Sequence, residues 1–145
     1  MSRILRNLAL VGVGGLGLIQ LVPYGRAHTN PPIVSEPRWD RPETRALAVR
    51  ACFDCHSNET MWPWYSHVAP MSWLVQSHVD DGRRALDFSD WSRTYRKTHD
   101  AAHAVTTGEM PLSSYTLIHE DARLSSVEQR ALADGLGATL GSGKD

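Results

Sequence analysis

The sequence predicts an all-α fold, and three observations support this prediction. Apolar residues recur at helical spacing in several segments, most clearly over residues 127–140. The run from Ser125 to Glu128 has the pattern of a capping box, which opens a helix by pairing a serine with a glutamate three residues later. No segment of useful length alternates apolar and polar residues as a half-exposed strand would. With 145 residues and 41% apolar content, we expect one helical domain behind an N-terminal segment.

Residues 1–27 form a separate segment with the features of an export signal or an N-terminal membrane anchor. Arg3 and Arg6 precede an uncharged run over residues 8–22, and this charge order matches the basic-inside bias of membrane segments. The run is shorter than the roughly 17 to 25 residues of a full span. We expect a hydrophobic helix that is kept as an anchor, with cleavage before His28 as the alternative. Either way, the chain is expected on the periplasmic side of a bacterial inner membrane.

Residues 28–38 contain three prolines and predict an extended linker, so the domain is expected to cover residues 39–145. Asp40 is expected to cap the first helix, because Pro42 would then lie in the first turn and Glu43 three residues after the cap. The pattern carries this helix up to Cys52. The first helix of the domain is therefore expected to end next to the only two cysteines of the chain.

Two more helices are expected in the middle of the chain. The spacing after Pro70 predicts one of them, although Gly82 lowers its helix propensity. Ser89 is expected to cap the other, and Gly108 is expected to end it. The apolar face of this helix would consist of Trp91, Tyr95, Ala102 and Val105.

The charge of the chain argues against a nucleic acid as its partner. Three of the 15 Lys and Arg residues lie in residues 1–27, which hold no acidic residue; the rest of the chain carries 12 basic and 16 acidic side chains, a net charge of −4. Phosphate binding needs an excess of clustered basic side chains, which is absent. A net charge of −4 is too small to specify a protein partner.

The two cysteines of the chain lie in a Cys-x-x-Cys-His pattern formed by Cys52, Cys55 and His56. This is the spacing of covalent c-type haem attachment. The two thiols can reach the two vinyl groups on one edge of the porphyrin, and the histidine that follows can bind iron as an axial ligand. The motif therefore predicts one covalently bound haem c.

Other interpretations of the two cysteines stay open at this point. A redox-active dithiol would be expected after a strand in a βαβ unit, and no strand is predicted before Cys52. A structural zinc site would need two further ligands from histidines or carboxylates. A plain structural disulfide is the remaining alternative.

Met110 is the best candidate for a second axial ligand. It follows a predicted helix and precedes Pro111, so its thioether can point inward from an irregular loop, although a core methionine that fills a gap is the alternative. Met61 lies only five residues beyond His56, too short a tether to round the porphyrin, and Met71 is a further candidate. The remaining histidines are expected to be surface or capping residues: His67, His78, His99, His103 and His119.

The domain is rich in aromatic side chains, and residues 61–65 predict a packed aromatic loop. A flat apolar cofactor would give large rings a surface to pack on, but an ordinary aromatic core explains any one of them equally well. These residues are Trp62, Trp64, Trp73, Trp91 and Tyr95.

The chain resembles the haem-binding domain family of short, membrane-tethered, cytochrome-c-like proteins. The matching segments are residues 21–26, 30–32, 51–60, 62–66, 69–73 and 108–111. The resemblance implies a haem-c site at Cys52, Cys55 and His56 in a small cytochrome-c-like helical domain that faces the periplasm. It also implies that the N-terminal segment is kept as an anchor, and it does not specify the distal ligand.

The leading functional hypothesis is one-electron transfer between a membrane or periplasmic donor and an acceptor. This hypothesis favours an electron carrier over an enzyme. A His56 and Met110 ligand pair would raise the reduction potential and close the iron to other ligands. An open-site haem protein, peroxidase-like or gas-sensing, is the alternative, for which His67, His78 or His103 could supply an acid-base group. A third alternative is a haem-free redox or interaction module.

Overall fold

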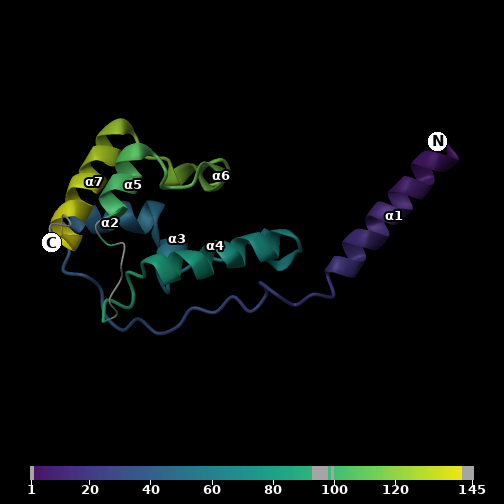
Figure 1. Ribbon diagram of the computed structural model, residues 1–145, viewed down its shortest axis with the longest axis horizontal. Helices are drawn as coiled ribbons and strands as arrows, with labels where there is room; N and C mark the ends of the chain where they lie inside the picture. Colours follow the sequence, from purple (N-terminus) through teal and green to yellow (C-terminus); the bar gives the residue numbers. More distant parts are fainter. Residues whose placement is uncertain (1, 93–97, 99, 142–145) are drawn as a thin grey trace. The chain divides into compact units, whose positions relative to one another are not determined.

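The computed structural model describes residues 2–92, 98 and 100–141 (Figure 1). Over these residues, every regular element is helical, and the only strand-like pairing is an isolated bridge between Ser35 and Asp90. This confirms the prediction of an all-α fold. The chain forms two compact units: unit 1 consists of residues 1–29 and 62–78, and unit 2 consists of residues 30–61 and 79–145.

Unit 1 begins with helix α1 (Arg3–Ile19), which lies within the segment where an N-terminal helix was expected. No residue of α1 is buried, and most of its apolar side chains are exposed. None of the helices in the described part of the chain is both long and apolar enough to cross a bilayer.

The rest of unit 1 is held by side chains that reach the backbone of distant residues. The Gln20 amide donates to the carbonyl of Ala69 at 2.9 Å, and its oxygen accepts the Ala69 N–H at 3.0 Å. A short 3-10 helix, η1 (Trp64–His67), precedes helix α4 (Met71–Ala85), which continues into unit 2. Trp64 is 80% exposed, so the expectation of a packed aromatic loop was wrong for this side chain.

Unit 2 is a helical cluster that contains the main apolar core. It consists of α2 (Pro42–Ala51), α3 (Phe53–His56), the end of α4, α5 (Asp100–Thr107), α6 (Ser113–Thr116), η2 (Glu120–Ala122) and α7 (Ser126–Leu140). Helix α7 packs against both α5 and α2 (Figure 1). Phe53, Phe88, Leu132 and Leu136 are buried where these elements meet.

The helix boundaries follow the sequence pattern where local signals set them. The capping box is present, because the Ser125 hydroxyl accepts the Glu128 N–H and the Glu128 carboxylate accepts the Ser125 N–H. Helix α2 ends next to the cysteine motif as predicted, with Cys52 as its C-cap. Its N-cap is Arg41, and Asp40 instead hydrogen-bonds the Thr44 side chain.

The predicted third helix starts later than expected. Helix α5 begins at Asp100, not at Ser89, and ends as predicted before Gly108, which has a φ of 76°. Ser89 is fully buried, and its hydroxyl accepts the Asn58 N–H at 2.9 Å, so tertiary contacts use the side chain that was expected to be a cap. Tyr95 and His99 lie outside the described residues.

Candidate cofactor site

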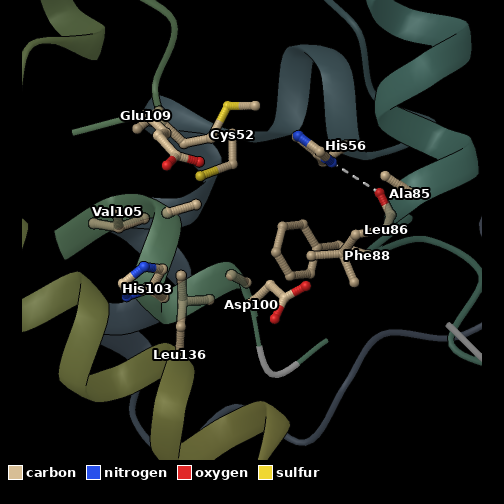
Figure 2. Close-up of a pocket in the computed structure, with 14 residues that line it drawn as sticks. Cys52, His56, Ala85, Leu86, Phe88, Asp100, His103, Val105, Glu109 and Leu136 are labelled. Carbon is tan, nitrogen blue, oxygen red and sulfur yellow. Dashed lines mark hydrogen bonds between the residues drawn. The ribbon is translucent and has the colours of Figure 1, made fainter. Parts of the chain in front are cut away.

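A cavity of about 400 Å³ opens between the helices of unit 2 (Figure 2). This volume falls within the range of small-molecule and cofactor pockets. The lining comes from both sides of the unit: from α2, α3, the end of α4 and the segment after it on one side, and from α5, α7 and the loop after α5 on the other. The cavity therefore lies where segments that are distant in sequence face one another.

Small side chains leave room in this cavity. Its lining includes Ala51, Ala85, Ala101 and Ala104 besides larger apolar residues such as Phe88. The two alanines of α5 are three residues apart and so share one helix face. Protein interiors normally fill such spaces to the density of organic crystals. An apolar, alanine-lined space suits a flat hydrophobic ligand that would complete the packing.

His56 lies at the end of α3, and its imidazole is oriented by the backbone. Its Nδ1 lies 3.0 Å from the carbonyl oxygen of Leu86 (Figure 2), and because a carbonyl can only accept, Nδ1 carries the proton. Nε2 therefore keeps its lone pair for a metal. Burial lowers the pKa of His56, which favours the neutral form that binds iron. The Phe88 N–H also donates to the His56 carbonyl at 2.8 Å.

The two cysteines are free thiols with different surroundings. Cys52 lines the cavity, whereas Cys55 packs against α4 and is not among the lining residues. Burial is the main cause that raises the pKa of Cys52 to about 12 and that of Cys55 to about 11. Dithiol oxidoreductases need the opposite shift, because the thiolate is their nucleophile. The environment of both thiols thus argues against the redox-dithiol interpretation.

Gly82 lets helix α4 approach the backbone of the cysteine motif. A Cβ atom at this position would lie 2.2 Å from the carbonyl oxygen of Cys55 and 2.8 Å from its carbonyl carbon, which are impossible contacts. From the sequence, Gly82 is expected only to lower the helix propensity of this segment. A glycine inside a helical pattern is also a sign of close packing, and that signal could have indicated a close contact at Gly82.

Met110 lines the same cavity as Cys52 and His56. Gly108 turns the chain at the end of α5, and the Met110 N–H then donates to the carbonyl of Ala104 at 3.0 Å. Met61 is 77% exposed and is absent from the cavity lining, and Met71 belongs to unit 1. Among the methionines considered, the structure therefore brings Met110 to the cavity that His56 lines.

Three polar residues reach the cavity on the side of α5: Asp100, His103 and Glu109. All three are exposed, so they form a polar rim to an apolar interior. His103 is a surface residue as expected, and of the three histidines considered as an acid-base group it is the one that lines the cavity. His67 and His78 belong to unit 1, and His119 stacks on Tyr115 with ring centroids 4.1 Å apart.

The aromatic side chains play a smaller part in the cavity than their number suggested. Phe88 lines it and packs against Trp39 and Phe53, with ring centroids 5.2 and 5.5 Å away. Trp62, Trp64 and Trp73 belong to unit 1. Trp91 packs against the core of unit 2 without lining the cavity.

The described residues offer no alternative metal centre of the usual kind. Within residues 2–92, 98 and 100–141, no group of three or more His, Cys, Asp and Glu side chains could hold a metal ion. A structural zinc site at the two cysteines would need such a group. The zinc interpretation thus finds no ligand set in this part of the chain.

These features define a small all-helical domain whose apolar cavity and backbone-oriented histidine suit a haem. The family model of the haem-binding domain matches residues 14–138, and the chain belongs to this family. No curated protein and no solved structure matches the chain. The family supports haem as the cofactor, which the donor set and the cavity lining fit.

Proposed function

We propose that the chain is a monohaem c-type cytochrome that carries single electrons on the periplasmic side of a bacterial inner membrane. One observation carries this proposal: Met110, from a distant segment of the chain, lines the same apolar cavity as Cys52 and His56. When bound, haem supplies an iron that takes up and releases one electron. A protein partner would deliver and accept that electron.

Each residue of the motif has a separate task in this proposal. The thiols of Cys52 and Cys55 would hold the porphyrin through thioethers, and His56 Nε2 would ligate iron. The hydrogen bond from Nδ1 to Leu86 fixes the ring plane and increases the basicity of the ligand. Met110 would occupy the second axial position through its sulfur. The apolar lining would limit the access of water to the cofactor.

The N-terminal segment supports the proposed location. Its basic start and uncharged run are typical of export, and covalent haem attachment of this kind takes place after translocation. We propose that residues 1–27 stay as an anchor, with cleavage before His28 as the alternative. The mass of the mature chain, recovered from a periplasmic and a membrane fraction, distinguishes the two.

Optical spectra of the exported protein test the ligand assignment. Wild type, M110A and M61A are expressed with a haem-attachment system and compared in oxidised and dithionite-reduced form. We expect a low-spin spectrum with a sulfur-to-iron charge-transfer band that is lost in M110A and kept in M61A, whose side chain is exposed. A colourless wild-type protein would contradict haem binding, and a haem that organic extraction removes would contradict the thioethers.

An open-site haem protein is the second candidate, and the position of His103 favours it. A histidine at the rim of the cavity could act on a small ligand at the iron as an acid or base. This candidate predicts a high-spin wild-type spectrum and ready binding of carbon monoxide. It also predicts that H103A changes peroxide reactivity, whereas H119A does not.

A further inference from the structure

A hydrogen bond links the segment that carries Met110 to the cysteine motif. Tyr115 lies in α6, and its hydroxyl donates to the Asp54 carboxylate at 2.5 Å, across 61 residues of sequence. Asp54 stands between Cys52 and Cys55. Hydrogen bonds from a hydroxyl to a carboxylate are about twice as strong as those between neutral groups.

Asp54 is a fixed acceptor, because other groups hold it in place. Its second carboxylate oxygen accepts the Met61 N–H at 2.8 Å, and its carbonyl accepts the Thr60 hydroxyl at 2.8 Å. Asp54 lies in the first turn of helix α3. The phenol of Tyr115 therefore meets an anchored carboxylate, not a mobile surface group.

Tyr115 is equally well fixed within its own segment. Its N–H donates to the Leu112 carbonyl at 3.0 Å, and its ring stacks on His119 with an interplanar angle of 14°. Only four residues separate it from Met110, whose N–H is bonded to Ala104 in α5. The Met110 segment is thus attached at one end to α5 and at the other end to the cysteine motif. The chain between these two attachments is short, which limits how far Met110 can move.

We propose that Tyr115 is a positioning residue for Met110: its bond to Asp54 keeps the methionine segment closed over the cavity that His56 lines. This inference rests on the proposed function, in which Met110 ligates the iron. Loss of the bond would raise the population of a state in which Met110 has left the iron. An external ligand then binds more tightly, because its apparent affinity scales with the population of the open state.

The test measures imidazole binding to the haem-loaded, full-length protein. We expect Y115F to bind imidazole roughly tenfold more tightly than wild type, since a lost hydrogen bond to a charged group is worth at least one decade in an equilibrium. D54N should also bind imidazole more tightly than wild type, and the double variant should bind it no more tightly than Y115F alone. The matched control is T106V, which also removes a hydroxyl, but one whose hydrogen bond stays within its own helix, to the Ala102 carbonyl at 2.8 Å; it should stay close to wild type.

The outcomes separate this inference from the proposed function. If wild type shows the sulfur-to-iron band and Y115F binds imidazole with wild-type affinity, the positioning role is wrong while the ligand assignment stands. If wild type lacks the band, the assignment of Met110 fails, and with it the role of Tyr115. A tenfold shift in Y115F, together with an unchanged affinity in T106V, supports both.

Discussion

The two sides of the cavity are held in different ways. On the His56 side, α4 touches the backbone of Cys55 at Gly82, Leu86 binds the imidazole, and the Phe88 N–H binds the His56 carbonyl. On the Met110 side, the segment after α5 relies on the bond to Ala104 and on the reach of Tyr115 to Asp54. The first side is built around a close backbone contact, and the second from separate hydrogen bonds, of which these are two.

This difference indicates which part of the site is rigid and which can change. Gly108 and Glu109, which precede Met110, are exposed, whereas Phe88 and Ser57 on the His56 side are buried. Elements with few buried contacts open at lower free energy than core elements. We therefore expect substitutions on the His56 side to affect folding most, and substitutions on the Met110 side to affect mainly the iron ligand.

The largest loss of stability is expected for Phe88→Ala. Phe88 is 1% exposed and stacks on Phe53, so its removal leaves a cavity and costs about 3 to 5 kcal/mol. Urea unfolding of the haem-free protein, followed by circular dichroism, measures this. V127A is the control, because Val127 is 66% exposed and should stay within about 0.5 kcal/mol of wild type. Equal effects of the two would mean that the His56 side is not a packed core.

Gly82→Ala tests the backbone contact of α4 with Cys55. The added Cβ would collide with backbone atoms that cannot rotate away, so we expect a cost near the upper end of about 1 to 3 kcal/mol. G137A is the matched control: its Cβ would meet only Ala102 Cβ at 4.0 Å, and alanine in an open helical site stabilises by about 0.4 to 1 kcal/mol. Shifts of opposite sign in the urea midpoint support the contact; a stabilised G82A would contradict it.

Local signals in the sequence predicted the elements they control directly. The capping box at Ser125, the end of α2 at Cys52 and the turn at Gly108 depend on residues within a few positions, and all three are present. The Cys-x-x-Cys-His motif and the loop position of Met110 likewise indicated residues that lie close together. Cys52, His56 and Met110 line one cavity, and Cys55 belongs to the same motif.

Contacts between distant segments could not be predicted from one sequence. Ser89 has the residue type of a cap but serves as an acceptor for Asn58, because tertiary burial overrides local preference. The approach of Gly82 to Cys55 and the bond of Tyr115 to Asp54 join segments 27 and 61 residues apart. Neither periodicity nor residue spacing in a sequence indicates such pairs, so these two contacts could be found only from the structure.

Arg83→Met tests a third contact on the His56 side, with a smaller expected effect. The Arg83 side chain donates to the carbonyl of the buried Ser57 at 2.8 Å and to Thr60 at 3.0 Å. Leaving that carbonyl without its partner should cost about 1.5 kcal/mol. R84M is the control, since Arg84 is exposed and pairs with Asp81, an interaction worth at most about 0.5 kcal/mol. Comparable urea midpoints for the two variants would contradict a structural role for Arg83.

The smallest effect, and one that depends on pH, is expected for Glu128, which joins the two sides. Its carboxylate closes the capping box of α7 and pairs with Arg50 of α2 at 2.6 Å. The Ser125 N–H, followed by Arg50 and the Ser125 hydroxyl, lowers the pKa of Glu128 from 4.5 to about 2.

Because the pKa of Glu128 is lower in the folded state, its contribution to stability is complete above about pH 4.5 and is lost as the pH falls towards 2. E128Q should therefore unfold at lower urea concentration than wild type at pH 7, and the difference should shrink at pH 3. A difference that is constant with pH would mean that the carboxylate charge is not what stabilises the junction of α2 and α7. The pairing would then contribute through packing alone, and the two sides of the cavity would be coupled by the apolar core, not by this ion pair.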